Sequence, residues 1–543
     1  MKAFGFAALL AGVSVFALSP AMADGLKVSA IAQGAAKEDG KAVESVLAPE
    51  FSQAVVAAGA MKLENPSAVN VAFGYAGDGP FVSAAGDTQT KDHMVEASKT
   101  EPDKNTYLVL TDAKGPDANY NYGTHFVFQG HEAGAMKDGK PQGYITRVNL
   151  DADEAHRVTL MADTDTSGNP LVFIDGSTYN PFAQRLLFTG EEGDEGGVWQ
   201  ATTSFPSKVD DLRGVIGIGS YEGIQADKDG NLWIVEDAGG KAGDVNKHAK
   251  QPNSFVYRFV PTDKTDLLKG GKLEALQVMA ADGQPIVFHD GKADDDILSG
   301  GMAEMYSYGK VLKTRWVLVH DTAKDGTAAF EANKLAKAVM ATPLKRPENG
   351  VFRPGTNFAE FYFTQTGDTN AETEAKAEHG GFGGIFKISQ ASPSDAEGTM
   401  SLVYRGDVNH TGLDNIQFAS AIDLLIVEDA GDKLHGQRKM LDSGFVLDLT
   451  KDYSAGGEPA RFLAEGRDPS ATIDSALSAA KDSGFQNSGD NEITGIHVSD
   501  GDASVEGLLG NKVPNLADKN WRMFYTQQHG DNRLFEVKYN TTM

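Results

Sequence analysis

Residues 221–240 read YEGIQADKDGNLWIVEDAGG, and this stretch decides the fold. Apolar and polar residues alternate up to the Asp229-Gly230 turn, and a short apolar run from Leu232 to Val235 precedes the acidic pair Glu236-Asp237. Alternation around an Asp-Gly turn predicts a tight β-hairpin. We therefore expect its carboxylates, including Glu222 at the start, to lie at strand ends.

The same pattern returns further along the chain. Residues 413–432 read LDNIQFASAIDLLIVEDAGD, and residues 491–501, NEITGIHVSDG, form a weaker copy. A hairpin that ends in acidic residues cannot bury its apolar face alone, and it gains stability by stacking on its neighbours. The repeats predict an all-β fold, a β-propeller with small helical insertions.

Short strands punctuated by Gly, Asp, Asn or Pro run through the chain from residues 68–75 onward, and long helical periodicity is missing. Short helices are predicted over residues 40–58, outside the propeller, and over residues 328–341, as an insertion. We expect an N-terminal extension over residues 24–67 and a single propeller domain over residues 68–543.

The composition limits the functions that the chain can have. Its 543 residues contain 49 Lys and Arg against 76 Asp and Glu, a formal net charge of -27. This charge repels nucleic acid and anionic membranes, and it fits either a soluble surface or the binding of cations. Cysteine is absent, so a metal would bind through oxygen or imidazole. We expect a monomer.

The first residues, MKAFGFAALLAGVSVFALSPAMADG, have the pattern of a secretory signal. A cation at Lys2 precedes an apolar run from Phe4 to Leu18, and small residues flank a cleavage site after Ala23. The run is short for a membrane span, and the rest of the sequence has none that is longer. We predict a signal peptide over residues 1–23 and a periplasmic or secreted protein.

Three acidic positions could carry chemistry. Thr189 to Glu195 contains four carboxylates, which repel one another unless a cation, raised pKa values or full solvation relieves the repulsion. Oxygen ligands of this kind suit Ca²⁺ or Mg²⁺, and the alternative is a solvated acidic loop. Glu222 stands alone before a strand, where a capping role is the alternative. Arg346-Pro347-Glu348 could present Arg to a phosphate and Glu to a metal, or form a surface ion pair.

Together these segments resemble the PhoX-type alkaline phosphatases, a family of secreted six-bladed propellers that use calcium with iron to cleave phosphomonoesters. The order of the motifs from about Phe73 to Val537 carries the resemblance. The motifs are Gly74 to Asp78, His131-Glu132, Thr189 to Glu192, Ser220 to Gly223, Phe255 to Val260, Arg346 to Glu348, Phe361 to Thr364, Thr366 to Asp368, Asn491 to Gly495, and Gln528-His529. Two positions depart from the family: Gly190 replaces the cysteine that binds iron, and Ala76-Gly77 replace an asparagine that contacts phosphate.

The resemblance implies a set of site residues. Arg346 is the implied catalytic residue, which would bind the phosphate of a small phosphorylated substrate. Glu492 and His529 are further candidates, and calcium is the implied cofactor. Iron is in doubt because glycine at position 190 has no side chain to bind it. The implied metal ligands are Glu191, Glu192, Glu222 and Glu348.

Several interpretations remain open at this stage. The first is a secreted metal-dependent phosphomonoesterase, and the second is a noncatalytic calcium-binding propeller that has lost phosphatase activity. A propeller lactonase or phytase would also use a central carboxylate calcium site. His131, His497 and His529 could act as general acids, although hydrogen-bonded structural histidines are more common in such positions.

Overall fold

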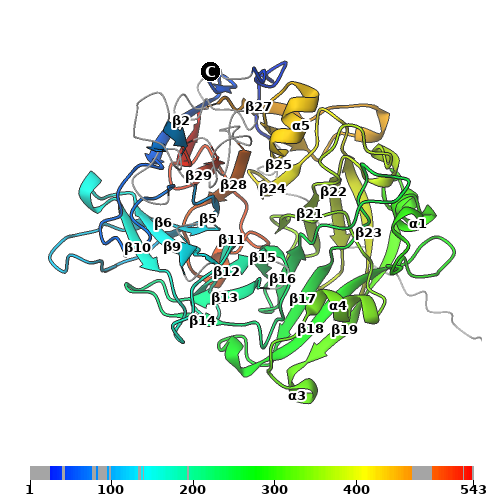
Figure 1. The fold of residues 1–543 in the computed structure, drawn as a ribbon, viewed down its shortest axis with the longest axis horizontal. Helices are drawn as coiled ribbons and strands as arrows, with labels where there is room; N and C mark the ends of the chain where they lie inside the picture. The colour runs from blue at the N-terminus through cyan, green and yellow to red at the C-terminus, as the bar shows by residue number, and fades with distance from the viewer. Residues whose placement is uncertain are drawn as a thin grey trace, which may run out of the picture.

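A computed structural model describes residues 25–38, 43–75, 81–83, 94–96, 99–132, 136–137, 140–191, 195–467, 492–529 and 531–540. Four of the sequence predictions fall outside these residues, namely the signal peptide at residues 1–23, the motif residues Ala76 to Asp78, Glu192 and Asn491. Within the described part, strands dominate and the helices are short (Figure 1).

The strands form antiparallel sheets. One sheet contains β5 (Pro102–Val109), β6 (His125–His131), β9 (Tyr144–Asn149) and β10 (Val158–Ala162). The next contains β11 (Ile174–Asn180), β12 (Arg185–Gly190), β13 (Gly197–Ala201) and β14 (Val209–Asp211). A nine-stranded sheet follows the order β15 (Tyr221–Ala226), β16 (Leu232–Glu236), β17 (Val256–Pro261), β18 (Gly271–Val278), β19 (Leu312–Asp321), β23 (Glu397–Arg405), β22 (Gly384–Ser389), β21 (Glu360–Gln365) and β20 (Gly350–Phe352).

Two further sheets and the short elements complete the described fold. One sheet contains β24 (Leu413–Phe418), β25 (Asp423–Glu428), β26 (Ser443–Asp448), β27 (Ala460–Ala464) and β1 (Val46–Leu47). The other contains β28 (Glu492–Ser499), β29 (Arg522–Gln528), β30 (Arg533–Tyr539) and β2 (Phe51–Ala57). Two small hairpins are β3 (Phe81–Ser83) with β4 (Met94–Glu96) and β7 (Met136–Lys137) with β8 (Lys140–Pro141). The helices are α1 (Ala293–Ile297), α2 (Gly300–Met305), α3 (Thr322–Asp325), α4 (Ala332–Ala338) and α5 (Gly431–Arg438).

The strands β5, β11, β15, β24 and β28 lie toward the centre of the molecule (Figure 1). Among the described strands, β5, β11, β15, β20, β24 and β28 contact one another in this order, and β28 returns to contact β5. This closed ring of inner strands is the arrangement of a propeller, because each sheet then packs its face on the next one. The predicted all-β propeller is confirmed.

An N-terminal strand completes the last sheet of the ring. Within residues 51–57, β2 pairs with the C-terminal β30, with Phe51 opposite Tyr539 and Ala57 near Leu534. The predicted helix over residues 40–58 is therefore wrong. The edge of β30 would otherwise present unpaired backbone groups, and pairing with β2 satisfies them.

Two other local predictions have different outcomes. Residues 68–75 form no strand, and pair only through isolated bridges such as Ala72 with Lys62. The Ser67 hydroxyl accepts hydrogen bonds from the backbone N–H groups of Val69 and Asn70, a local turn that competes with strand pairing. The inserted helix predicted over residues 328–341 is confirmed in shorter form as α4.

The apolar core lies between neighbouring sheets. Trp233 of β16 is buried and packs its ring against Trp316 and Phe361, each with a centroid separation of 5.0 Å. These residues come from three strands of the nine-stranded sheet, and their contacts hold the two halves of this sheet together. No helix in the described ranges combines the length and apolar character that a bilayer span requires.

Candidate metal centre

Every inner strand brings a carboxylate to the same end of the ring. The six inner strands lie side by side around the ring axis. The acidic residue near the start of each strand therefore faces a shared space at that axis. A cavity of about 390 Å³ lies there. Six of the carboxylates that line it come one from each inner strand or from the residues just before it, namely Asp103, Asp175, Glu222, Glu348, Asp414 and Glu492.

Irregular pairing aims several of these carboxylates. The register between β15 and β16 shifts between Tyr221 and Ile224, so Glu222 lies in a bulge. The same shift occurs around Asp103, Asp175 and Asp414 in their own strand pairs. A β-bulge bends the strand and re-aims a side chain that regular pairing would direct elsewhere. The bulges therefore explain why acidic residues near four strand starts turn toward the axis.

Glycines next to the carboxylates let the inner strands approach closely. A Cβ atom at Gly176, which follows Asp175, would lie 2.1 Å from the backbone oxygen of Glu222. A Cβ atom at Gly223 would lie 2.8 Å from the Cα of Asn349. Such contacts are too short for any side chain, so these two positions require glycine. The Asp-Gly and Glu-Gly pairs are thus part of how the ring closes.

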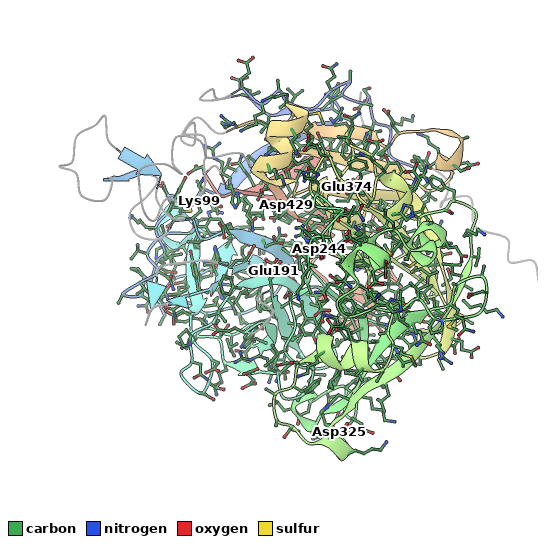
Figure 2. All side chains as sticks on the ribbon, turned by 45° about the vertical axis from the view of Figure 1, so that its right-hand side comes forward. Lys99, Glu191, Asp244, Asp325, Glu374 and Asp429 are labelled. Atoms are coloured by element: carbon green, nitrogen blue, oxygen red, sulfur yellow. The ribbon has the colours of Figure 1, made fainter. Side chains whose placement is uncertain are left out.

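The second strands supply a further layer of polar groups around the same cavity. Glu132, Glu191 and Asp429 follow the ends of β6, β12 and β25, and His529 follows β29. In Figure 2, Glu191 and Asp429 lie toward the middle of the molecule, whereas Asp325 of α3 lies at its periphery. Asp237 follows β16 in the same way and contacts Arg346 from there.

The carboxylates form three overlapping groups that could hold a cation. Within each group, one oxygen of every residue lies within 4.8 Å of the others. Glu191 and Glu222 each belong to two groups, so neighbouring groups share a residue and are not separate sites. The groups are Glu132 with Asp175 and Glu191, Glu191 with Glu222 and Asp237, and Glu222 with Glu348 and Asp414.

Burial and mutual repulsion shift the pKa values of several carboxyl groups at the cavity upward. Burial is the larger cause and raises the pKa of Glu222, Asp175 and Asp414 well above the usual range, and neighbouring carboxylates raise it further. The same causes raise the pKa of Asp103 to about 7 and that of Glu348 to about 8. A crowded set of this kind favours the ionised form only when a cation is nearby.

The donor set fits a hard divalent cation such as calcium. All the ligand atoms in the three groups are carboxylate oxygens. Ca²⁺ prefers oxygen ligands and coordinates six to eight of them. Asp175 Oδ1 and Asp103 Oδ1 are buried and accept no hydrogen bond among the described residues. Buried oxygens without a donor are costly, and a bound cation would compensate them.

An iron site with a thiolate ligand does not fit. Gly190 ends β12 beside the cavity, at the position that the family resemblance assigns to cysteine. A Cβ atom there would lie 2.6 Å from Cζ3 of Trp199 on β13. The indole ring of Trp199 fills the space that a cysteine side chain would need, so the departure from the family extends beyond a single residue.

Arg346 enters the cavity from the loop before β20. Its Nε donates to both carboxylate oxygens of Asp237, at 2.8 and 3.0 Å, and Nη2 donates to Asp237 Oδ2 at 2.5 Å. Nη2 also lies 3.6 Å from Glu348 Oε1. Asp237 thus fixes the plane of the guanidinium, while Nη1 has no hydrogen bond to any described residue. Nη1 remains available to an anionic ligand.

Several residues at the cavity have a strained backbone. Arg346, His529, Glu101 and Thr369 line the cavity and have positive φ angles of 57°, 58°, 46° and 47°. Residues other than glycine rarely adopt this region, at a cost of about 1–3 kcal/mol each, and such residues cluster at functional sites. The strain supports the view that the chain is folded to place these side chains.

The three histidines considered from the sequence have different surroundings. His529 lines the cavity, with Nδ1 at 3.1 Å from Glu492 and Nε2 at 3.3 Å from Glu101. His131 is fully buried, contacts the hydroxyls of Thr100 and Thr146, and stacks on Tyr144. Burial lowers the pKa of His131 well below its usual value. His131 is therefore structural, and His497 does not line the cavity.

Most of the residues chosen from the sequence come together in this one space. Glu191, Glu222, Arg346, Glu348, Glu492 and His529 all line the cavity, and Glu192 lies outside the described residues. Sequence reasoning did not select Asp103, Asp175, Asp414 or Glu132 as ligands. A signal was available for Asp414, because it occupies the place of Glu222 in the repeated hairpin.

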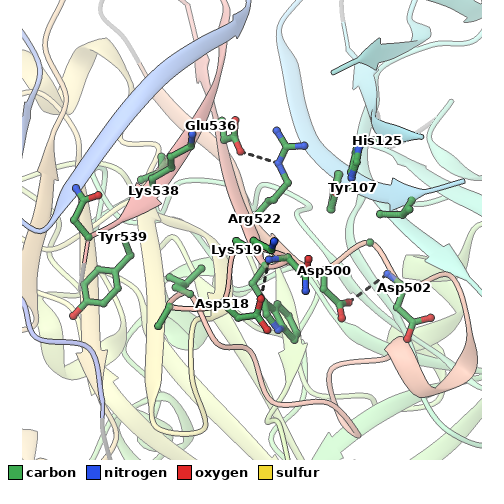
Figure 3. A pocket seen from close by; sticks show the side chains of 18 of the residues that line it. Tyr107, His125, Asp500, Asp502, Asp518, Lys519, Arg522, Glu536, Lys538 and Tyr539 are labelled. Carbon is green, nitrogen blue, oxygen red and sulfur yellow. Dashed lines mark hydrogen bonds and ion pairs between the residues drawn. The ribbon is translucent and has the colours of Figure 1, made fainter. Parts of the chain in front are cut away.

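A larger cavity lies elsewhere, between the sheets of β5 and β28. It measures about 990 Å³ (Figure 3). Some of its lining residues form ion pairs: Arg522 pairs with Glu536 at 2.7 Å, and Asp502 pairs with Lys512 at 2.9 Å. Because the cavity at the ring axis combines crowded carboxylates with an arginine, we place the candidate site there.

Comparisons with known proteins agree with the propeller fold. A sequence model of the family Alkaline phosphatase PhoX matches residues 247–505, a range that contains Arg346, Glu348 and Glu492. Among solved structures, Pseudomonas fluorescens PhoX in complex with vanadate, a transition state analogue, has a TM-score of 0.50 at 12% identity. The match covers 94% of this chain and 98% of that chain. No curated protein matches the chain significantly.

Other solved structures are more distant. A nidogen/laminin complex has a TM-score of 0.29 at 10% identity, covering 68% of this chain and 88% of that chain. Virginiamycin B lyase from Staphylococcus aureus has a TM-score of 0.29 at 11% identity, covering 80% and 99%. Likeness at this level has no bearing on function. The predicted resemblance to the PhoX-type alkaline phosphatases is confirmed, from the sequence over residues 247–505 and from the fold over most of the chain.

Proposed function

We propose that this protein is a secreted phosphomonoesterase that depends on calcium bound by the carboxylates at the ring axis. One observation carries the proposal: a cavity at the axis combines three overlapping carboxylate groups with the side chain of Arg346. The family match and the likeness to a PhoX protein that binds vanadate support phosphoester chemistry. Residues 1–23 are proposed as the signal peptide.

Glu191, Glu222, Glu348 and Asp414 would hold the cation, with Asp175 and Glu132 on the adjoining wall. Glu192 remains a proposed ligand from the sequence. Bound calcium would supply positive charge that neutralises phosphate oxygens and polarises the phosphorus. No thiolate is available, so the proposal includes no iron of the family type.

Arg346 would bind the phosphate of the substrate. Asp237 orients the guanidinium, and Nη1 can donate to an equatorial oxygen whose charge increases in the transition state. Burial and the carboxylates of Asp237 and Glu348 act on this guanidinium in opposite directions, and together they raise its pKa well above the usual value. The arginine therefore stays charged at every relevant pH.

His529 is the candidate proton donor for the leaving alkoxide. It lines the cavity between Glu492 and Glu101, which hold its two ring nitrogens and fix its orientation. The substrate class is a small phosphorylated molecule, because a cavity of about 390 Å³ admits no macromolecule.

The test is hydrolysis of a phenyl phosphate with calcium added to metal-free protein. We expect turnover that requires calcium, and a loss of about 100-fold in Arg346→Ala, because an oriented donor to the transition state is lost. Arg353→Ala is the matched control, since Arg353 pairs with Glu360 at 3.0 Å and does not line the cavity. If calcium restores no activity above that of Arg346→Ala, the noncatalytic calcium-binding propeller remains as the function.

A further inference from the structure

Lys104 places a positive charge inside the ring of inner strands. It follows Asp103 on β5, within the bulge between Pro102 and Asn105, and only 2% of the residue is exposed. Its backbone oxygen accepts a hydrogen bond from the Ser177 hydroxyl on β11, which fixes this part of β5 against the neighbouring sheet. Lys104 is not among the residues that line the cavity, so it lies behind the carboxylates.

The side chain of Lys104 spans the centre of the ring. Its Nζ donates to Asn349 Oδ1 at 2.5 Å, and Asn349 immediately precedes β20. In the cyclic order of the inner strands, β20 stands three places from β5 in either direction. A hydrogen bond between opposite members of the ring requires the ammonium to lie close to the axis.

Carboxylates from four inner strands attract this ammonium electrostatically. Burial lowers the pKa of Lys104 to about 8, while four negative groups oppose that shift, namely Asp414, Asp103, Glu222 and Asp175. An ammonium has three N–H donors, and that of Lys104 makes one hydrogen bond among the described residues. Its main role toward the carboxylates is therefore electrostatic, and in a buried site such attraction is strong.

We propose that Lys104 is a resident cation of the ring, which takes the place of a further metal ion among Asp103, Asp175, Glu222 and Asp414. This inference rests on the proposed metal centre. It adds that the charge of Lys104 limits the number of metal ions that bind there. The negative charge of these four carboxylates is balanced by a side chain that, unlike a metal ion, cannot leave the protein. The same carboxylates can then face calcium on the cavity side and Lys104 on the inner side, so no further divalent ion is needed behind them.

The test counts calcium ions. Wild type and Lys104→Ala are dialysed to equilibrium against calcium, and calcium per chain is measured by elemental analysis together with calorimetric titration. Removing the ammonium leaves space and uncompensated negative charge among oxygen ligands, so we expect Lys104→Ala to bind about one more calcium ion per chain. Lys387→Met is the control, because Lys387 forms an ion pair with Glu360 at 3.2 Å and neither residue lines the cavity.

Each outcome decides between the proposals. An additional ion in Lys104→Ala supports the resident cation, and it does so even if wild type binds none, a result that would contradict the proposed calcium centre alone. An equal number of ions in both proteins, one or more, overturns the inference and leaves the calcium centre standing. Absence of calcium from both proteins overturns both proposals.

A charge-preserving variant covers the case in which Lys104→Ala does not fold. Lys104→Arg keeps the positive charge, and we expect it to bind as many calcium ions as wild type. An additional ion in Lys104→Arg would overturn the inference, because the charge would then not determine the number of ions. Far-ultraviolet circular dichroism checks that each variant is folded before the ions are counted.

Discussion

A side chain at position 190 would collide with the ring of Trp199. The collision explains why the sequence can depart from the family at Gly190 without leaving a vacant iron site: the indole occupies the space of the missing ligand. The glycine at position 190 and the ring of Trp199 packed against it both exclude a thiolate ligand, and both favour a centre built from oxygen ligands alone.

We predict that Gly190→Cys does not create an iron site and instead destabilises the fold. A Cβ atom 2.6 Å from Trp199 forces the ring or the strand to move, which should lower the free energy of unfolding by about 1–3 kcal/mol. Urea unfolding measures this change, and elemental analysis measures iron. Gly300→Cys is the control, because no atom lies within 4 Å of its Cβ position. Iron bound by Gly190→Cys at unchanged stability would contradict the prediction.

Single residues also show the limit of reading the site from the sequence. Glu222 and Glu348 can be chosen from a repeated hairpin and a short motif, and both line the cavity. Asp103 and Asp175 carry no such local signal. Their place at the axis depends on bulges and on the closure of the ring, which arise from pairing between distant segments.

At the scale of the elements, the hairpin pattern predicts the strands well. The predicted hairpin at residues 221–240 is β15 and β16, and its repeat at residues 413–432 is β24 and β25. The prediction failed over residues 40–58, where β2 forms. The partner of β2 is β30, near the other end of the chain, and no local pattern reveals such a partner.

We predict that the pairing of β2 with β30 holds the ring closed. Ser52 and Lys538 are directly opposite one another and exposed, and the chain has no cysteine of its own. Ser52→Cys combined with Lys538→Cys should therefore form one disulfide without competing pairs. Locking the two ends should raise the free energy of unfolding by about 2–4 kcal/mol. Thermal unfolding with and without reductant measures the effect, and identical midpoints would show that β2 contributes nothing to closure.

At the scale of the whole molecule, the ring concentrates negative charge at one point while the surface remains strongly acidic. Six inner strands each contribute a carboxylate, and among the described residues Arg346 and Lys104 supply compensating positive charge. The fold therefore brings together groups that repel one another, which lowers its stability until a cation binds. The crowding that lowers stability in the metal-free state is the same feature that suits the proposed cation site.

The metal-free protein should accordingly become less stable as pH rises. Carboxyl groups in the unfolded chain lose their protons near pH 4, whereas burial holds Asp429, Asp103 and Glu348 protonated to about pH 6, 7 and 8 in the fold. The folded state then binds more protons than the unfolded state, so stability is fully present below pH 4 and is lost between about pH 4 and 8. Each such proton contributes a slope of about 1.4 kcal/mol per pH unit.

Calcium should reverse this loss, because it binds the ionised carboxylates of the folded state alone. Urea unfolding of chelator-treated protein at several pH values, with and without calcium, measures both effects. Glu222→Gln removes one buried acid that is shared by two carboxylate groups. The stability of this variant without metal should therefore fall less steeply as pH rises, and calcium should stabilise the variant less than wild type. Glu274→Gln is the control, since Glu274 pairs with Arg258 at 2.7 Å outside the cavity and should behave like wild type. Stability of the metal-free protein that rises from pH 4 to 8 would show that the ring carboxylates are not held in the buried, crowded state on which the metal centre depends.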